Sequence, residues 1–252
     1  MEHTRAGILG ITTALELQEK LMLKKPRGCI TIVAAEFLGD ESINYASPWA
    51  GAHFRAVPCM SPQEVRERKL KQVTWDVLRA RSKTYPEAGI EFMDAYEYFK
   101  DPPEEYVKLQ GSYSEAEGFQ LLRQEELLPN IKFGSKYTAW CLNPPVYCAF
   151  LLRRFLVRGG KVLRLKLASL AEAASLAPDI KVVVNGSGVG FGDPDMFPIR
   201  GQFSATSRLD CKSWWPTSSR VSLHIILCTS GLLVSFPYQK LLICSCRPDL
   251  SS

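Results

Sequence analysis

The chain has 252 residues, of which 46% are hydrophobic and 23% are charged. This composition is typical of a globular protein and excludes a disordered chain, a collagen-like chain and a protein with several membrane spans. Lysine and arginine number 31 against 26 aspartates and glutamates, which gives a net charge of +5. The excess is too small to predict the clustered basic face of a nucleic-acid-binding protein, so we expect no nucleic-acid partner.

The composition changes near residue 203. Residues 203–252 contain five basic and two acidic residues, and four of the eight cysteines. Because the cysteines and the three histidines show no paired CxxC or HxxxH spacing, we predict no metal site. The amino-terminal MEHTRAG lacks the apolar run of a secretory signal, so we expect an intracellular protein, cytoplasmic or peroxisomal, with reduced thiols.

The first hundred residues predict helices alternating with strands. An amphipathic pattern predicts a helix over residues 6–25, and the β-branched run CITIVAA predicts a buried strand that ends at Glu36. Ser61 and Glu64 form a capping-box pattern with proline between them, which predicts a helix that runs toward Arg81. The alternating IEFMDAYEYF predicts a strand over residues 90–99.

The next hundred residues continue the alternation after an interruption. Residues 100–130 are polar and broken by proline and glycine, and we predict a long excursion with one short helix over residues 115–128. We then predict, in order, a helix over residues 143–158, a strand over 161–167, a short helix capped by Ser169 and a strand over 180–184. Strands that alternate with helices in this way favour an α/β fold.

A glycine-rich segment opens the first predicted helix. A dinucleotide-binding fingerprint needs three small residues: one for a tight turn, one for close approach to the pyrophosphate and one for helix packing. Gly7 and Gly10 stand at the second and third positions, and Arg5 stands at the first. Glu36 ends the following strand, where a carboxylate can bind the ribose of a nucleotide.

Five ordered segments of the chain resemble the FAD-dependent D-amino-acid oxidase family. They run colinearly from Ala6 to Gln202, and the most specific are SPWAGAHF (47–54) and VVVNGSGVGFGDPDMFPIRGQ (182–202). The resemblance implies a Rossmann-like FAD-binding domain with a strand-rich substrate domain. An NAD-dependent Rossmann enzyme is a further alternative, and the SPWAGAHF loop disfavours it.

The resemblance also implies which residues bind FAD. Gly7, Ile8 and Gly10 would lie at the pyrophosphate and Glu36 on the ribose. The remaining matches are Ser47, Trp49, Ala50, Gly51 and Ala52 in the loop that passes the flavin, Val162 at the adenine, Gly188 in a second glycine-rich turn, and Arg200, Gly201 and Gln202 in the stretch that leads into the substrate domain.

The reaction implied by the resemblance is oxidation of a D-amino acid to an imino acid that hydrolyses to a 2-oxo acid. Oxygen then reoxidises the flavin and yields hydrogen peroxide. The cofactor carries this chemistry, so no catalytic side chain is assigned. The expected partners are therefore a D-amino acid and oxygen.

The pattern departs from the family at both ends. Only five residues precede Ala6, so we expect an incomplete first strand, unpaired neighbouring strands and a malformed pyrophosphate turn. After Gln202 we expect no family resemblance, and we divide the chain into an oxidase-like segment, 1–202, and a divergent tail, 203–252. Within the first segment, residues 43–140 mix the flavin loop with substrate-domain elements.

Two alternatives follow from these departures. The chain could be a catalytically inactive fragment that binds at most a nucleotide or a partner. The tail could be the product of a misassigned exon or a shifted reading frame. Residues 221–236 are mostly apolar but are fewer than the ~20 residues that a membrane span needs, which disfavours a membrane anchor. The chain ends in DLSS, which does not match the carboxyl-terminal tripeptide that directs proteins to peroxisomes.

Overall fold

The computed structural model describes residues 4–23, 28–40, 42, 45–50, 52–188 and 191, and the backbone of four strands between residues 203 and 245. The chain forms two compact units that interleave along the sequence. The first unit comprises residues 1–52, 87–89 and 143–199, and the second comprises 53–86, 90–142 and 200–252. Gln202 lies outside the described residues, so the boundary predicted after it stays a prediction.

The first unit is built on parallel strands. Its elements are α1 (Ile8–Leu23), β1 (Thr31–Ala34), the 3-10 turn η1 (Ser47–Trp49), α4 (Pro144–Val157), β5 (Lys161–Arg164) and α5 (Leu170–Ala174). β1 pairs in parallel with β5, from Thr31 opposite Lys161 to Ala34 opposite Arg164. On the other side of β1, a parallel bridge joins Arg5 to Glu36. The described sheet of this unit therefore has two parallel strands, β1 and β5, with one isolated bridge beyond the end of β1, an arrangement consistent with a Rossmann-like fold.

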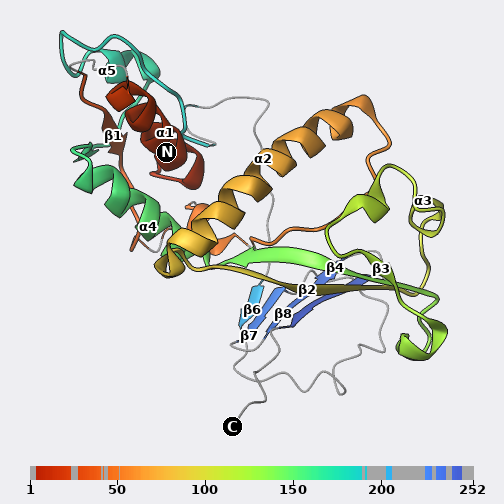
Figure 1. Cartoon of the computed structure of the whole chain (residues 1–252). Helices are drawn as coiled ribbons and strands as arrows, with labels where there is room; N and C mark the ends of the chain where they lie inside the picture. The colour runs from red at the N-terminus through yellow and green to blue at the C-terminus, as the bar shows by residue number, and fades with distance from the viewer. Residues whose placement is uncertain are drawn as a thin grey trace. The chain divides into compact units, whose positions relative to one another are not determined.

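Helices α1 and α4 pack together in this unit (Figure 1). The side-chain amide of Gln18 donates to the carbonyl oxygens of Phe155 and Arg158 at 3.1 and 3.0 Å, which satisfies the last carbonyls of α4. Ile11 and Leu151 are fully buried. The core of the unit therefore consists of the facing sides of these two helices.

The second unit is a mostly antiparallel sheet, in which only β6 and β7 pair in parallel among the described strands, with a long helix, α2 (Pro62–Thr84), over one face (Figure 1). Its central pair, β2 (Ile90–Phe99) and β4 (Phe133–Leu142), is joined over ten residues of each strand. The order of the whole sheet is β3, β4, β2, β9, β8, β7, β6. The outer strands are β3 (Gln120–Leu121), β6 (Phe203–Ala205), β7 (Ile225–Cys228), β8 (Gly231–Phe236) and β9 (Lys240–Ser245), and the short helical turns are η2 (Pro86–Ala88), α3 (Glu104–Val107), η3 (Tyr113–Glu115) and η4 (Gln124–Glu126).

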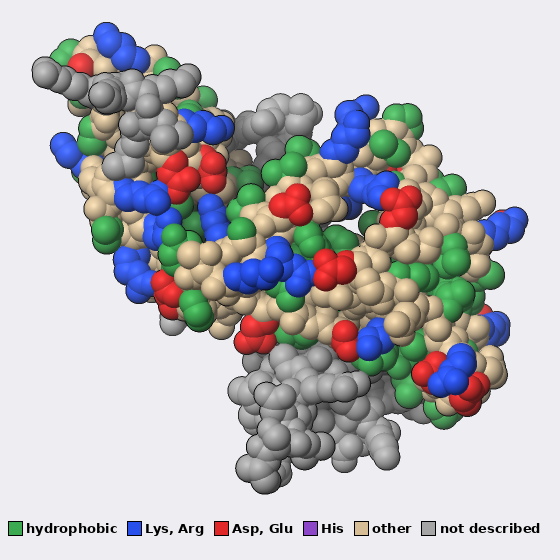
Figure 2. Space-filling model, in the orientation of Figure 1, with side chains coloured by type: hydrophobic (Ala, Val, Ile, Leu, Met, Phe, Trp, Pro, Cys, Tyr) green, Lys and Arg blue, Asp and Glu red, His purple; other side chains and the backbone are tan. Residues whose placement is uncertain are grey.

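Aromatic side chains join α2 to the sheet. The ring of Trp75 makes edge contacts with Phe54 and Phe92, at centroid distances of 4.8 and 5.2 Å. Charged side chains of both signs are interspersed over the visible face of the protein (Figure 2). Two arginines of α2, Arg68 and Arg79, pair with Glu115 and Glu117. The aromatic contacts attach the helix to the sheet, and Arg79 adds a cation–π contact with Phe92, at 3.9 Å from the ring centroid.

The structure confirms most of the predicted elements. Helix α1 begins two residues later than predicted, and β2 has the predicted bounds. The capping box is present, because Ser61 Oγ accepts from the Glu64 amide at 3.2 Å and the Glu64 carboxylate accepts from the Ser61 amide at 2.7 Å. Asn143 caps α4 and Ser169 caps α5. The predicted α/β class is confirmed.

Two predicted elements are wrong. The helix predicted over residues 115–128 is replaced by η3, β3 and η4. Gly118 has a φ of +67°, which an α-helix does not contain, and the Thr138 amide of β4 donates to the Glu117 carbonyl at 2.7 Å. Residues 180–184 form no strand, because their backbone has no ladder partner within the described part of the chain.

The incomplete first strand that we expected is observed as a single isolated bridge, between Arg5 and Glu36, with no strand before α1 among the described residues. The Ala6 amide donates to the Glu36 carbonyl, and the Ala35 amide donates to the Thr4 carbonyl, each at 2.9 Å. Thr4 to Ala6 therefore pair with the chain at the end of β1. Residues 225–236, part of the segment considered as a membrane anchor, form β7 and β8 in the second sheet. In the described part of the chain, no helix is long and apolar enough to cross a membrane.

Candidate functional site

The candidate site lies at the carboxyl ends of the parallel strands of the first unit. The chain turns from residues 4–6 into α1 at Gly7, and β1 ends just before Glu36. Both turns leave the same edge of the sheet, which is where nucleotides bind in open α/β folds. The structure thus brings the fingerprint and Glu36 together, as we predicted from the sequence.

Ser47 joins the flavin-loop segment to the start of α1. Its hydroxyl oxygen accepts a hydrogen bond from the Ile8 amide at 3.0 Å. The amino terminus of α1 is therefore capped by a residue 39 positions further along the chain. A Cβ atom on Gly7 would lie 2.9 Å from this oxygen, so the contact requires glycine there. Tyr45, which is 1% exposed, donates its hydroxyl to the Ala6 carbonyl at 2.5 Å. The loop is therefore held against the turn by two side chains.

The first turn of α1 contains backbone amides that can donate hydrogen bonds to a ligand. The backbone amides of Leu9 and Gly10 have no hydrogen-bond partner among the residues that the structure describes. Free amides at a helix amino terminus attract anions, because the helix dipole adds to the field of the N–H groups. This turn can therefore bind a phosphate group.

Gly10 packs against a glycine that the sequence interpretation missed. A Cβ atom on Gly186 would lie 3.0 Å from the Gly10 Cα atom, so the two backbones approach as closely as glycine allows. Gly188, which we selected instead, has a φ of +67° and no atom within 4 Å of an added Cβ. The repeated glycines of NGSG were the available signal, but spacing alone did not show which of them packs on α1.

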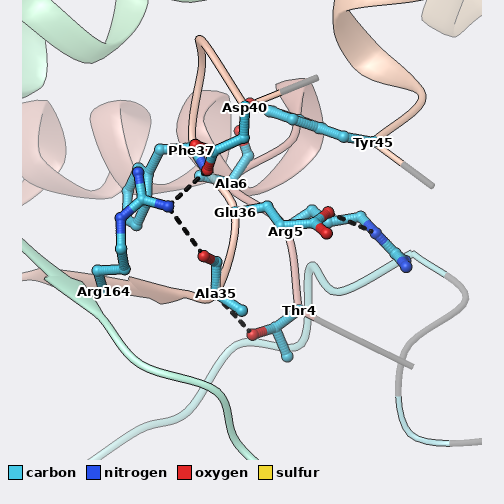
Figure 3. A network of polar contacts seen from close by, with 9 residues as sticks. All are labelled: Thr4, Arg5, Ala6, Ala35, Glu36, Phe37, Asp40, Tyr45 and Arg164. Atoms are coloured by element: carbon cyan, nitrogen blue, oxygen red, sulfur yellow. Dashed lines mark hydrogen bonds and ion pairs between the residues drawn. The ribbon is translucent and has the colours of Figure 1, made fainter. Parts of the chain in front are cut away.

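Glu36 is ion-paired to Arg5, the residue at the first fingerprint position (Figure 3). Arg5 Nε lies 3.2 Å from Glu36 Oε2, and the two side chains are 7% and 16% exposed. Arg5 is not among the residues with positive φ, so the arginine causes no left-handed strain in this turn. The carboxylate predicted to bind ribose thus already has a cationic partner.

The loop after Glu36 is held by Arg164, at the end of β5 (Figure 3). Asp40 Oδ2 accepts from the Phe37 amide at 2.7 Å and from Arg164 at 2.5 Å, and Arg164 also donates to the Ala35 carbonyl at 3.1 Å. The hydrogen bond from Arg164 lowers the pKa of Asp40 below its ordinary value. These contacts fix the position of the chain on either side of Glu36.

The other predicted site residues lie apart from these contacts. Trp49 is 54% exposed at the end of η1, and Ala50 and Ala52 follow it. Val162 lies on β5 opposite Ile32 and is 42% exposed. Gly51, Arg200, Gly201 and Gln202 lie outside the described residues.

The second unit contains a buried ion pair that the sequence interpretation missed. Glu97 is fully buried on β2 and accepts from Arg55 Nε and from the Tyr113 hydroxyl, each at 2.8 Å. The Tyr113 hydroxyl also lies 2.6 Å from Ser135 Oγ. Burial raises the pKa of Tyr113 well above its usual range, so it stays protonated. The cluster satisfies its own polar atoms and has the character of a structural network.

The second unit also has an open pocket of about 250 Å³ between α2 and β4. It is lined by Phe54, Glu67, Leu70, Lys71, Thr74 and Trp140. None of these is a residue that we predicted to bind FAD. Within the described residues, no group of three His, Cys, Asp or Glu side chains gathers as a metal site would require.

Comparison with known proteins identifies the family. The sequence model of the FAD dependent oxidoreductase family matches residues 6–248. The chain belongs to the FAD dependent oxidoreductase family. The match extends beyond Gln202, where we expected the resemblance to end.

Individual relatives of the family agree with this assignment. The chain is 38% identical over 216 residues to a D-aspartate oxidase of Talaromyces thermophilus, and 29% identical over 202 residues to a D-amino-acid oxidase of Schizosaccharomyces pombe. These alignments cover 78% of this chain and 58% and 56% of the relatives, so the chain spans little more than half their length. Among solved structures, glycine oxidase from Bacillus cereus superposes with a TM-score of 0.47 at 11% identity, covering 96% of this chain and 72% of that one.

The site fits the pyrophosphate end of the FAD that gives the family its name. Gly7 permits the contact with Ser47, and Gly186 permits the close approach to Gly10. The Leu9 and Gly10 amides, which have no partner among the described residues, can donate to phosphate. The ribose end departs from the fingerprint, since Arg5 lies on Glu36. We name the turn at residues 7–10 the candidate phosphate cradle, and the ion pair of Arg5 and Glu36 lies beside it.

Proposed function

We propose that this chain forms the FAD-binding part of an oxidase that deaminates D-amino acids. The reaction would convert a D-amino acid, water and oxygen into a 2-oxo acid, ammonia and hydrogen peroxide. The observation that carries this proposal is the family match over residues 6–248 together with 38% identity to a D-aspartate oxidase. The phosphate cradle at the start of α1 supports it independently.

We assign the FAD-binding roles as follows. Gly7, Ile8 and Gly10 would approach the pyrophosphate. The amides of Leu9 and Gly10 support this role, because they have no partner among the described residues. Glu36 would bind the ribose, and Val162 would meet the adenine from β5. Residues 47–52 would pass the flavin, which the bond from Ile8 to Ser47 supports, because it holds this loop at the helix start. Gly188 would form a second turn near FAD.

When bound, FAD supplies the two-electron redox chemistry, as acceptor of the substrate α-hydrogen with its electron pair and as donor to oxygen. The side chains of this chain would hold the FAD-binding segments in position. Ser47 and Tyr45 hold the loop and the turn in register, and Arg164 and Asp40 fix the chain after Glu36. Because FAD supplies the redox chemistry, the proposed reaction requires no general acid or base from the first unit.

D-Aspartate is our first candidate substrate. The relative at 38% identity is a D-aspartate oxidase, whereas the D-amino-acid oxidases match at 28–29%. Neutral D-amino acids, such as D-alanine, form the alternative within the same class.

The test combines FAD binding with a peroxide assay. Purified protein incubated with FAD and freed of excess ligand should retain flavin absorbance. It should then produce hydrogen peroxide with D-aspartate or D-alanine and none with the L-enantiomers. A protein that retains no flavin, or that retains flavin and oxidises no D-amino acid, contradicts the proposed function of this chain.

A further inference from the structure

The ion pair between Arg5 and Glu36 has a consequence for FAD binding. We propose that the guanidinium of Arg5 occupies the carboxylate that would bind the ribose, so that FAD must displace Arg5 from Glu36. This inference rests on the proposed function, because it assumes FAD binding at the α1 turn. It makes Arg5 a determinant of FAD affinity in this chain.

The backbone places the two residues opposite each other before any ligand arrives. A parallel bridge joins Arg5 to Glu36, and the Ala6 amide donates to the Glu36 carbonyl at 2.9 Å. The side chains then meet on one side of this bridge, with Nε 3.2 Å from Oε2 (Figure 3). Because the bridge already fixes both backbones, the pair forms without further loss of backbone entropy, and only the rotamers of the two side chains are restricted.

Ribose hydroxyls and the guanidinium would both donate to the Glu36 carboxylate, whose Oε2 already accepts from Arg5 Nε. An ionised carboxylate is acceptor-only, and ribose hydroxyls and the arginine N–H groups are both donors. Arg5 Nε already donates to Glu36 Oε2 in the structure, so a ribose hydroxyl that approaches this oxygen meets an existing donor. With side chains only 7% and 16% exposed, the pair leaves little room for a sugar beside it.

The fingerprint explains why this competition arises here. At its first position a glycine contributes no side chain, so that nothing stands between the turn and the nucleotide. Arg5 introduces a long cationic side chain at that position. The alternative role for Arg5, donation to the pyrophosphate, is disfavoured because the contact that the structure gives its side chain is with Glu36.

The test compares ligand affinity between the wild-type chain and Arg5→Gln and Arg5→Gly variants. Isothermal titration calorimetry with FAD and, separately, with ADP measures Kd without reliance on turnover. ADP contains the ribose and pyrophosphate but no flavin, so it reports on this end of the site alone. We expect both variants to bind FAD and ADP about tenfold more tightly, a difference of about 1.4 kcal/mol.

Two controls define the origin of the effect. Arg153→Gln removes one positive charge from the exposed side of α4 and should leave both Kd values unchanged. In a Glu36→Gln background, the further change Arg5→Gln should have no effect, because the competing pair is already broken. Circular dichroism and thermal melting without ligand identify any variant that fails to fold, and Arg5→Gln retains a side chain if Arg5→Gly does not fold.

The outcomes separate the two proposals. If the wild-type chain binds FAD as tightly as the folded Arg5 variants, or more tightly, the inference about Arg5 is wrong and the proposed function stands. If no variant binds FAD or ADP, both are wrong. Tighter binding by the Arg5 variants that persists in the Glu36→Gln background also overturns the inference, since the effect would not pass through Glu36.

Discussion

The hydroxyl oxygen of Ser47 accepts a hydrogen bond from the backbone amide of Ile8 at 3.0 Å, across 39 positions of sequence. An N-cap normally comes from the residue just before a helix. Here the cap of α1 comes from η1, so one hydrogen bond ties the flavin-loop segment to the phosphate cradle. The stability of the helix start and the position of the loop therefore depend on the same atom.

We expect Ser47→Ala to lower both stability and FAD affinity. Loss of a cap costs about 1 kcal/mol of unfolding free energy, and the loop loses its attachment to α1. Urea denaturation and FAD titration measure the two effects. Ser61→Ala is the matched control, because it removes the cap of α2 in the second unit. It should reduce stability by a similar amount and leave the FAD Kd unchanged; an equal loss of FAD affinity in both variants would contradict the role of Ser47.

The close approach of Gly186 to Gly10 predicts opposite effects on stability for alanine substitutions at these two positions. Gly186→Ala places a Cβ 3.0 Å from the Gly10 Cα and should destabilise the protein by about 1–3 kcal/mol. Gly10→Ala meets its nearest atom at 3.9 Å and lies within α1, so it should stabilise the helix by about 0.5–1 kcal/mol.

Chemical denaturation distinguishes these two glycine variants. Gly28→Ala, with no atom within 4 Å of the new Cβ, is the control and should change stability by less than about 0.5 kcal/mol. Equal destabilisation by Gly186→Ala and Gly10→Ala would show that the close approach is not the one described.

The buried pair of Glu97 and Arg55 predicts a large effect in the second unit. Glu97→Gln removes the negative charge and leaves the Arg55 guanidinium, whose side chain is 24% exposed, without its ionised partner. We expect a loss of about 3 kcal/mol in unfolding free energy, near the lower end for broken buried pairs because Arg55 retains some contact with water. Glu91→Gln, at an exposed position on the same strand, should cost less than about 0.5 kcal/mol. A small loss for Glu97→Gln would mean that the pair contributes little beyond its hydrogen bonds.

Acid should weaken the contact between Asp40 and Arg164. The pKa of Asp40 is lowered in the folded chain, so its stabilising contribution is present above its ordinary value of 3.8 and is lost as the pH falls through the lowered pKa. The melting midpoint of the wild-type chain should therefore exceed that of Asp40→Asn at pH values well above 3.8, and the gap should narrow as the pH falls below 3.8. Asp179→Asn makes the same change in charge without touching Arg164 and serves as control. A gap that stays constant over this range would exclude the proposed contribution of Asp40.

Sequence patterns predicted the elements whose signals are local. The Ser61 and Glu64 capping box, the Asn143 cap and the alternation of residues 90–99 each depend on neighbours within a few positions, and each is confirmed. The helix predicted over residues 115–128 failed because the amides of that segment bond to β4 or to their own turns. Residues 180–184 failed as a strand because a strand needs a partner, and composition does not show whether one is present.

The sequence by itself determined the family, the α/β alternation, the glycines of the α1 turn and the placement of Glu36 at the end of a strand. Only the tertiary structure decided what these residues contact. Ser47 caps α1, Gly186 packs on Gly10, and Arg5 pairs with Glu36 across 31 positions. These contacts join distant segments through strand pairing and close backbone approach, and no local propensity encodes which distant residue will be met. Arg5 illustrates the difference: in the sequence it is a missing glycine, and in the folded chain it is the partner of the carboxylate beside the phosphate cradle.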